Sequence, residues 1–408
     1  MRGILSRKLS KCAVALTVAL AVLSVTLVSA QVVPPVVDEE VQAGDSIMIM
    51  KTVTTPSIPQ VVDVCLLEDE TGSFSDDIAN LQGGTTASDI YDTIVAGSPG
   101  AQFAVAGFRD YPEYPYGYPG DWVYRRTSGM SPVKADWLAG IAALTAGGGA
   151  DAPEAQYDAI VAAAGPGVFA DPTLGDQPDC GWRDPAITPG VQRVLVVTTD
   201  ATFHVGPDGT HVNNQATTLA ALAAQNIVVV GLAAPGSGGP PGGDLCNLAV
   251  ATGGSCQELS SDGANIGEAI LAGLEAVTTD VWWEVVADPG LTVTLSPAVY
   301  MDVPGNTSIV FTETISVDAS IPGGTTLNAV VTFIANNYPE EGAPIGTQEI
   351  TIHVPIMGVG GITDFFATPS SGTGWGAYTW VLGIAGLAGL VGLAMVSRRV
   401  RTRLFTRR

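Results

Sequence analysis

Between residues 61 and 277, short continuous apolar segments alternate with amphipathic ones, and no other feature of the sequence constrains the fold as strongly. Runs rich in Val, Leu and Ile are typical of strands buried on both faces, as in parallel sheets. We expect such strands at residues 61–68, 101–108, 191–198 and 227–232. Strands that alternate with helices predict an α/β fold with a doubly wound, mostly parallel sheet.

The amphipathic segments between and after these strands predict the helices of the domain. They lie at residues 76–81, 132–143, 153–164, 213–224 and 265–277. In open α/β sheets, functional side chains gather in loops at the carboxyl ends of the strands. We therefore look for a site in the loops that follow the predicted strands.

After residue 279 the hydrophobic pattern changes from helical to alternating, with Pro and Gly turns between the segments. Alternation with period two predicts a C-terminal β-sandwich at residues 279–356. An N-terminal strand and connector, residues 31–60, can complete this sandwich. The α/β domain, residues 61–278, would then be an insertion into the sandwich.

Both ends of the chain have the pattern of targeting segments. Residues 1–30 predict a secretory signal peptide, with an uncleaved anchor as the alternative. A linker at 357–374 precedes an uncharged apolar segment, 375–397, that is long enough for a transmembrane helix. A basic tail, 398–408, follows and predicts a single-pass protein of the cell membrane whose N-terminal region is extracellular.

The charge of the chain restricts its partners. The formal net charge is −23, and all 40 acidic residues lie between the two basic ends. Such a surface disfavours nucleic acid, which binds clustered Lys and Arg, and favours divalent cations. A salt-adapted surface is the alternative explanation.

Four cysteines remain after the predicted signal peptide. In a secreted chain, the short spacing of Cys246 and Cys256 in a Gly-rich loop region predicts a disulfide. Cys65 lies in an apolar strand and is either a buried thiol or the partner of Cys180.

Oxygen-bearing side chains lie in three places along this alternation of strands and helices. Asp69, Thr71 and Ser73 come at alternate positions after the first strand, Asp151 and Glu154 precede a helix, and Asp200 follows the strand at 191–198. Carboxylate and hydroxyl oxygens that converge on one point are suitable ligands for Mg²⁺. Taken alone, the first motif is also compatible with a turn in which a Ser caps the next helix.

These motifs, in this order, resemble the metal ion-dependent adhesion site of von Willebrand factor A domains, above all the I-like domain of integrin β subunits. The resemblance covers residues 61–276 and also includes Asp76-Asp77, Asp151-Ala-Pro-Glu154, Gly181-Trp182-Arg183 and Thr199-Asp200-Ala201.

The resemblance implies three ion sites. The principal Mg²⁺ would be bound by Asp69, Thr71, Ser73, Glu154 and Asp200, and an adjacent ion, Ca²⁺, by Asp76 and Asp77. A third site would use Asp110, Asp151, Glu154 and the Pro153 carbonyl, although Gly149 stands where the family has an Asn ligand. Thr145 and Asp151 are rivals of Glu154 at the principal site, and Asp76-Asp77 can also act as favourable charge at a helix N-terminus.

The loop after the second strand contains three tyrosines, Tyr114, Tyr116 and Tyr118. Exposed aromatic side chains are typical of recognition surfaces, so these residues are candidates for ligand binding. The alternative is a loop stiffened by Pro that packs on its own domain.

The favoured function is a non-enzymatic, membrane-anchored adhesion protein that captures a carboxylate of an extracellular protein or glycan. A metal with few carboxylate ligands keeps net positive charge and attracts such a group. A partner chain is possible but has no signature in the sequence. One alternative is an extracellular metal-dependent hydrolase, in which His204 would be the residue that assists proton transfer. The other is a structural envelope protein.

Overall fold

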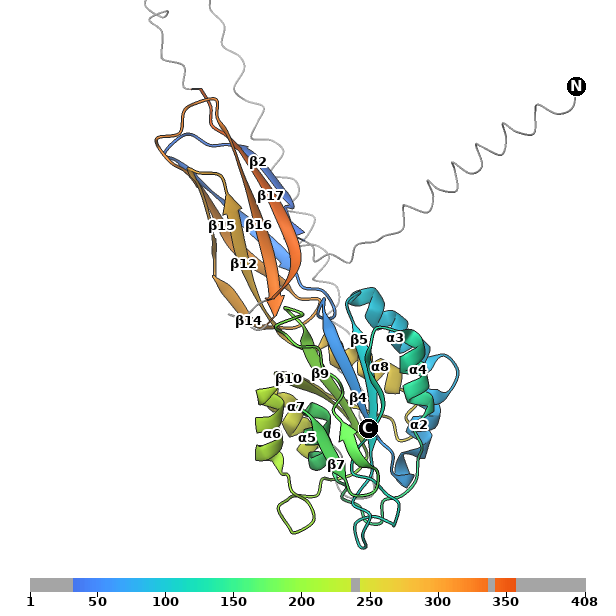
Figure 1. Ribbon diagram of the computed structural model, residues 1–408. Helices are drawn as coiled ribbons and strands as arrows, with labels where there is room; N and C mark the ends of the chain where they lie inside the picture. Colours follow the sequence, from blue (N-terminus) through green and yellow to red (C-terminus); the bar gives the residue numbers. More distant parts are fainter. Residues whose placement is uncertain (1–31, 236–242, 337–341, 357–408) are drawn as a thin grey trace, which may run out of the picture. The chain divides into compact units, whose positions relative to one another are not determined.

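The computed structural model describes residues 32–235, 243–336 and 342–356, which belong to one compact unit (Figure 1). The predicted signal peptide (1–30), linker (357–374), transmembrane helix (375–397) and basic tail (398–408) lie outside the described residues. Among the helices that are described, none has the length and apolar character needed to cross a membrane.

A six-stranded sheet forms the centre of the α/β part. Its strands, in spatial order, are β11 (Cys256–Glu258), β10 (Ile227–Ala233), β9 (Gln192–Thr199), β4 (Val62–Asp69), β5 (Gln102–Phe108) and β6 (Arg125–Ser131). All pairs are parallel except β5 with β6. Every residue of β4 and β9 is buried, as predicted for strands covered on both faces.

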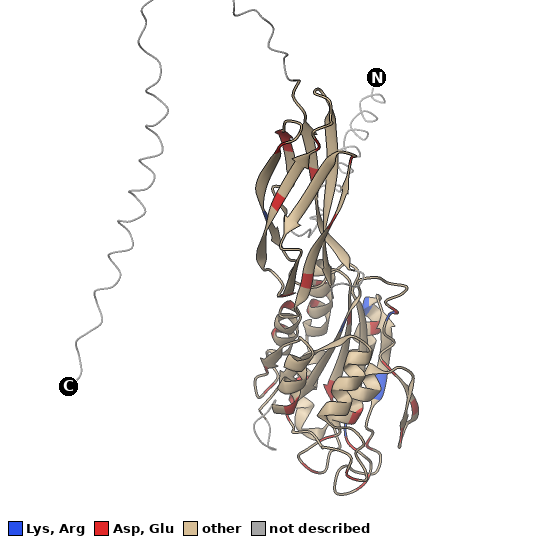
Figure 2. Ribbon diagram, turned by 90° about the vertical axis from the view of Figure 1, so that its left-hand side faces the viewer, with Lys and Arg blue, Asp and Glu red and all other residues tan. Residues whose placement is uncertain are grey.

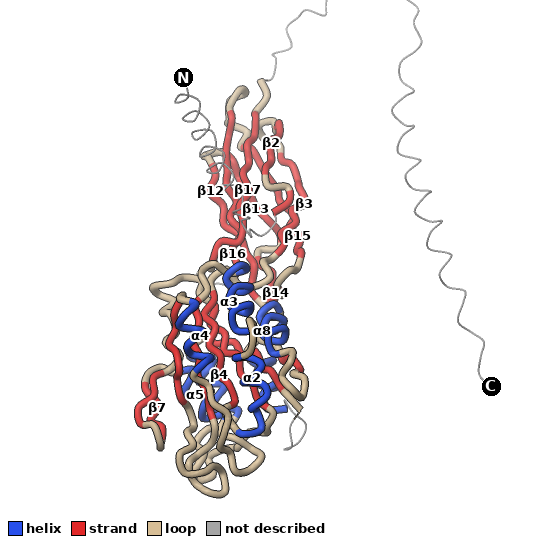
Figure 3. Tube along the Cα trace, turned by 90° about the vertical axis from the view of Figure 1, so that its right-hand side faces the viewer, coloured by secondary structure: helices blue, strands red, loops and turns tan. Residues whose placement is uncertain are grey.

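Helices cover both faces of this sheet (Figure 1), and Figure 3 looks onto one of the two helical layers. One layer consists of the short η1 (Gly72–Phe74) with α2 (Ser75–Gln82), α3 (Thr86–Gly97), α4 (Lys134–Ala142) and α8 (Ile266–Glu275). The other consists of α5 (Gln156–Ala164), α6 (Gln215–Ala224) and α7 (Gly243–Ala251). Val64 and Leu66 of β4 pack in the first core and Cys65 and Leu67 in the second, because successive strand residues point to opposite faces.

Several elements of the α/β part were not predicted. Helices α3 and α7, the edge strand β6, and the hairpin of β7 (Val168–Asp171) and β8 (Gly175–Pro178) fall in segments for which no helix or strand was predicted. The expectation that Cys246 lies in a loop is wrong, because it is part of α7. Strand β6 has the polar sequence RRTSGMS and therefore lacks the apolar signal of a buried strand.

Two further sheets form a β-sandwich. One contains β1 (Val32–Val33), β3 (Ser46–Thr54), β15 (Ser308–Val317) and β13 (Leu291–Ser296). The other contains β14 (Val299–Val303), β12 (Thr279–Ala287), β16 (Thr326–Asn336), β17 (Ala343–His353) and β2 (Val36–Glu40). Strands β1 to β3 precede the α/β part in sequence, and β12 to β17 follow it. The inward side chains of the two sheets make a single apolar core.

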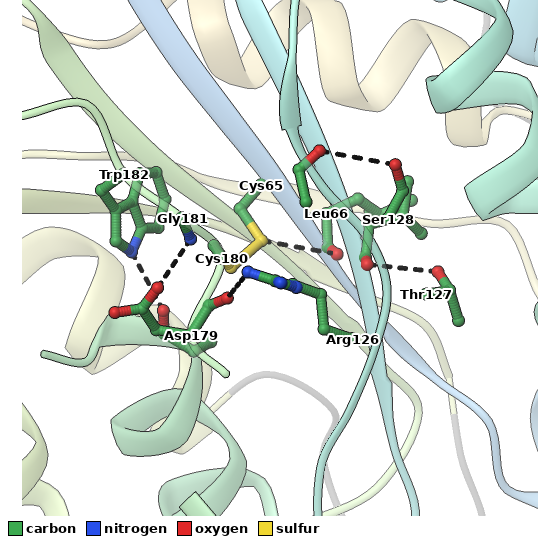
Figure 4. Close-up of a disulfide and its surroundings, with 12 residues drawn as sticks. Cys65, Leu66, Arg126, Thr127, Ser128, Asp179, Cys180, Gly181 and Trp182 are labelled. Atoms are coloured by element: carbon green, nitrogen blue, oxygen red, sulfur yellow. Dashed lines mark hydrogen bonds between the residues drawn. A yellow bond between two sulfur atoms is a disulfide. The ribbon is translucent and has the colours of Figure 1, made fainter. Parts of the chain in front are cut away.

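Two disulfides tie elements of the α/β part together. Cys246 in α7 is bonded to Cys256 in β11, as predicted. Cys65 in β4 is bonded to Cys180, the second of the two alternatives for this thiol (Figure 4). Next to Cys180, the Asp179 carbonyl accepts a hydrogen bond from Arg126 Nη1 at 2.6 Å. The bridge therefore fastens the segment before β9 to the central strand.

The two disulfides should differ in their effect on stability. Their sequence separations are 115 and 10 residues, and the loss of loop-closure entropy predicts about 5 and about 3 kcal/mol at 25 °C. We expect Cys65→Ala/Cys180→Ala to lower the free energy of unfolding more than Cys246→Ala/Cys256→Ala in urea titrations of the full-length protein. An equal loss of unfolding free energy in the two double variants, or the reverse order, would contradict this prediction.

Candidate metal centre

Asp69 is the last residue of β4 and lies at the carboxyl end of the central strand. Its side chain is completely buried and accepts three hydrogen bonds. The amide and hydroxyl of Thr71 donate to Oδ1 at 2.9 and 2.6 Å, and the Thr199 hydroxyl donates to Oδ2 at 2.7 Å. These contacts fix the orientation of the carboxylate.

Ser73 connects this group to Asp200, which follows β9. Its Oγ lies 3.3 Å from Thr71 Oγ1 and donates to Asp200 Oδ1 at 3.0 Å. Four of the five residues predicted for the principal site are therefore joined by direct oxygen contacts. Neither η1 nor α2 has a side-chain N-cap hydrogen bond, so the alternative of a capping Ser is not observed.

Glu154, the fifth residue, lies in the loop before α5. Its backbone is held by the loop after β9, with Glu154 N donating to the Thr202 carbonyl at 3.0 Å and His204 N donating to the Glu154 carbonyl at 2.9 Å. A Cβ on Gly149 would lie 2.6 Å from Glu154 Oε1 and 3.3 Å from Thr71 Cβ. The Glu154 carboxyl group therefore approaches Thr71, and the glycine leaves room for it.

The carboxyl groups of this cluster have raised pKa values. Burial raises the pKa of Asp69 to about 7, although the hydrogen bond from Thr71 opposes the rise. Burial, followed by the neighbouring carboxylates of Asp69, Asp110, Asp151 and Asp200, raises the pKa of Glu154 to about 11. Glu154 Oε2 is buried and accepts no hydrogen bond. A divalent cation would satisfy this oxygen and favour the ionised carboxylates, so the donor set fits Mg²⁺.

The two residues predicted for the adjacent ion have different surroundings. Asp76 is exposed, whereas Asp77 is buried on α2 beneath the loop that contains Gly263. Asp77 Oδ1 accepts no hydrogen bond. Burial raises the pKa of Asp77 to about 6, and the charge of Asp200 adds to the rise. Asp77 is thus electrostatically coupled to the principal cluster.

A second cluster contains imidazole nitrogens as well as oxygens. Asp110, His204 and His211 offer ligand atoms that all lie within 4.8 Å of one another and can hold a metal ion. His204 Nε2 lies 3.3 Å from Asp110 Oδ2 and 3.3 Å from Asp151 Oδ1. His211 Nε2 lies 3.3 Å from Asp110 Oδ1, and its Nδ1 lies 2.9 Å from Asp208 Oδ2.

This arrangement changes the composition of the third site. Asp110 and Asp151 contact histidines, while their link to Glu154 is the electrostatic one described above. His211 was not predicted, because nothing in the sequence brings it close to Asp110. The two imidazole rings stack with centroids 4.0 Å apart.

The tyrosines predicted to bind ligand are divided by the fold. Tyr114 and Tyr118 are 83% and 54% exposed. Tyr116 packs edge-on against His204 and His211, with ring centroids 5.0 and 4.7 Å away. One ring of the loop therefore packs on its own domain and two face the solvent, and ligand binding by Tyr114 and Tyr118 stays a prediction.

Thr145, a rival of Glu154 in the sequence, makes its hydrogen bonds to Arg109 and Glu70. Arg109 Nη2 donates to its carbonyl at 2.9 Å and to its Oγ1 at 3.2 Å. Its amide donates to Glu70 Oε1 at 2.6 Å, and Glu70 forms an ion pair with Arg125 at 2.5 Å. These two arginines and Glu70 position the loop that carries Gly149, and their role was not predicted.

Comparison with known proteins adds little to this geometry. No family model matches the chain, and no curated protein matches it. Among solved structures, the chain is similar to a von Willebrand factor type A protein from Catenulispora acidiphila, with 14% identity, a TM-score of 0.39 and coverage of 78% of this chain and 72% of that chain. It is also similar to the pilus adhesin SpaC from Lactobacillus rhamnosus GG, with 10% identity, a TM-score of 0.35 and coverage of 76% of this chain and 46% of that chain.

The raised carboxylate pKa values predict how stability depends on pH without metal. The pKa of Asp69 is about 7 in the folded protein, above its ordinary 3.8. Asp69 therefore binds its proton more tightly when folded, and its contribution to stability is lost as pH rises from about 4 to about 7. In a chelator, unfolding midpoints of the full-length protein should fall across this range, and excess Mg²⁺ should oppose the fall.

Asp69→Asn should make the fall in unfolding free energy between pH 4 and pH 7 smaller. The difference should be at most about 4 kcal/mol, the free energy that corresponds to the pKa change. Asp176→Asn, which alters an exposed acid in β8, is the matched control and should leave the pH dependence as in the wild type. Identical pH profiles for Asp69→Asn and wild type would show that Asp69 is not perturbed.

Proposed function

We propose that this chain is a membrane-anchored adhesion protein of the cell surface that captures an acidic group through a Mg²⁺ ion held by Asp69, Thr71, Ser73, Glu154 and Asp200. The observation that carries the proposal is the continuous set of oxygen contacts from Asp69 to Asp200 beside the buried, unsatisfied Glu154 Oε2. When bound, Mg²⁺ would supply a positively charged centre for a carboxylate of an extracellular protein or glycan.

The chain's own residues would hold and orient the ion. Thr71 and Ser73 contribute neutral hydroxyls, which leave more of the positive charge for an incoming ligand than carboxylates would. Glu154 belongs to a separate loop that is fastened to the loop after β9 through its backbone. We assign a second ion, Ca²⁺, to the vicinity of Asp77 and Asp76. Tyr114 and Tyr118 are the exposed residues that would contact the bound partner.

A binding role is preferred to hydrolysis because of the state of His204. Its Nε2 lies between two carboxylate oxygens at 3.3 Å, and Tyr116 packs against its ring. A general base must be free to reach the proton of an attacking water. His204 is engaged by Asp110 and Asp151 instead, which supports a non-enzymatic protein.

Anchoring and location rest on the sequence. The signal peptide at 1–30 and the membrane helix at 375–397 would place the α/β domain outside the cell. Figure 2 shows many more acidic than basic residues on the described part of the chain. This excess suits an extracellular protein that binds divalent cations, and it disfavours nucleic acid as a partner.

The cluster of Asp110, His204 and His211 would hold a different class of ion. Imidazole nitrogen favours borderline metals such as Zn²⁺ over Mg²⁺, which prefers oxygen. Asp208 Oδ2 lies 2.9 Å from Nδ1, the other ring nitrogen of His211, and would accept a hydrogen bond from it, an arrangement that orients metal-binding histidines. We propose that this third site takes Zn²⁺ or a similar ion.

The adhesion proposal predicts that Asp69→Ala and Asp200→Ala abolish Mg²⁺ binding in calorimetric titrations of the full-length protein. Both variants should also lose Mg²⁺-dependent attachment to arrays of extracellular matrix proteins and acidic glycans, without any change in hydrolytic activity on those arrays. Asp176→Ala removes one exposed carboxylate from the same domain and should retain both properties. Attachment that survives in a chelator, or hydrolysis that depends on Asp69, would overturn the proposal.

The cluster of Asp110, His204 and His211 predicts one bound metal ion in addition to Mg²⁺. In excess Mg²⁺, the full-length protein should bind one Co²⁺ or Zn²⁺, and Co²⁺ should give the visible absorption of a nitrogen-ligated site. His211→Ala and His204→Ala should each weaken this binding by about 10-fold or more. His353→Ala, in which the lost histidine lies beside the sandwich residues Asp38 and Thr326, is the control. Equal binding by all three variants would exclude the site.

A further inference from the structure

Three polar side chains meet inside the otherwise apolar core of the β-sandwich. Lys51 lies in β3, Glu313 in β15 and Gln348 in β17, and each side chain is completely buried. Lys51 and Glu313 are on neighbouring strands of one sheet, because Lys51 pairs with Phe311. Gln348 belongs to the opposite sheet. The group therefore spans the space between the two sheets.

One oxygen of Glu313 contacts both of the other groups. Glu313 Oε2 accepts a hydrogen bond from Gln348 Nε2 at 3.1 Å and lies 3.7 Å from Lys51 Nζ. Lys51 Nζ also donates to the Pro34 carbonyl at 2.7 Å. Glu313 Oε1 and Gln348 Oε1 are buried and have no hydrogen-bond partner among the described residues. An amine, an acid and a carboxamide are thus brought together with two oxygens unsatisfied.

Noncovalent contacts alone do not explain why these three side chains are buried together. A buried ion pair is often no more stabilising than apolar residues of the same volume, and each unsatisfied buried oxygen has a free-energy cost. Burial lowers the pKa of Lys51 and raises the pKa of Glu313. Both directions favour the neutral forms, a free amine and a carboxylic acid, and a free amine is a nucleophile.

We propose that Lys51 and Gln348 condense into an intramolecular isopeptide bond, with Glu313 transferring the proton between their nitrogens. The bond would join β3 to β17 and link the two sheets covalently. This inference concerns the sandwich and is independent of the metal sites and of the proposed adhesion function.

The reaction is balanced without an external reagent. Glu313 takes one proton from the Lys51 ammonium, and the resulting Nζ attacks Cδ of Gln348 to form a C–N bond. The bond from Cδ to Nε2 then breaks as Nε2 accepts a proton from Glu313 and leaves as ammonia. Of the protons on the Lys51 ammonium, one stays on the new amide, one leaves with ammonia and one remains on Glu313. The product has no charged group in the core, so burial favours it.

Gln348 is the better acceptor because of the position of Glu313. Oε2 lies 3.7 Å from the attacking nitrogen and 3.1 Å from the leaving nitrogen, so it is placed between the two groups that exchange the proton. A bond between Lys51 and Glu313 would instead consume the acid and release water. The two products differ in mass, so one measurement separates them.

The test is mass spectrometry of proteolytic digests of the purified full-length protein. We expect one fragment in which the peptides containing Lys51 and Gln348 are joined, lighter than their sum by one ammonia. Separate peptides with unmodified Lys51, or a joined pair of Lys51 and Glu313 lighter by one water, would overturn the proposal.

Two variants and one control sharpen the result. Glu313→Gln keeps the shape of the acid but cannot transfer the proton, and Lys51→Met keeps the volume of the amine but removes the nucleophile. Both should give only separate peptides, with circular dichroism confirming that each has folded. Lys134→Arg alters a half-buried lysine outside the sandwich, whose Nζ lies 2.6 Å from Asp92 Oδ2, and should leave the joined fragment intact. A joined fragment in folded Glu313→Gln would refute the role of the acid.

Discussion

The parallel pairing of β4 with β9 is the constraint on which the site depends. Parallel neighbours end at the same edge of the sheet, so Asp69 and Asp200 come together although 131 positions separate them in the chain. The pairing also delivers Thr199 to the Asp69 carboxylate. Once both strands are buried from each face by helices, these oxygens cannot separate without opening the core.

Much of the α/β sheet could be predicted because its central strands carry a strong local signal. Continuous apolar runs identify β4, β5, β9 and β10 within a residue or two. The edge strand β6 gave no such signal, since its residues are polar and only half-buried. Helix α7 also escaped prediction because its start adjoins a Gly- and Pro-rich segment, a composition typical of loops.

The candidate site was predictable where ligand spacing is local and unpredictable where tertiary packing decides. Asp69, Thr71 and Ser73 lie within one turn, and their contacts follow from that spacing. The approach of His211 to Asp110 requires two loops to fold over each other, and no hydrophobic periodicity in the sequence indicates such a contact. The buried Lys51 was equally hidden, because a lone lysine in a strand is ordinarily taken to face the solvent.

The placement of β1 to β3 before the α/β part, and of their partners after it, affects biosynthesis. Strand β3 leaves the ribosome long before β15, with which it pairs, so its edge has no partner while the intervening residues are made. The α/β part begins with β4 and ends with α8, and its folding shortens the effective loop between the separated strands. Completion of the sandwich during translation should therefore depend on earlier folding of the inserted residues.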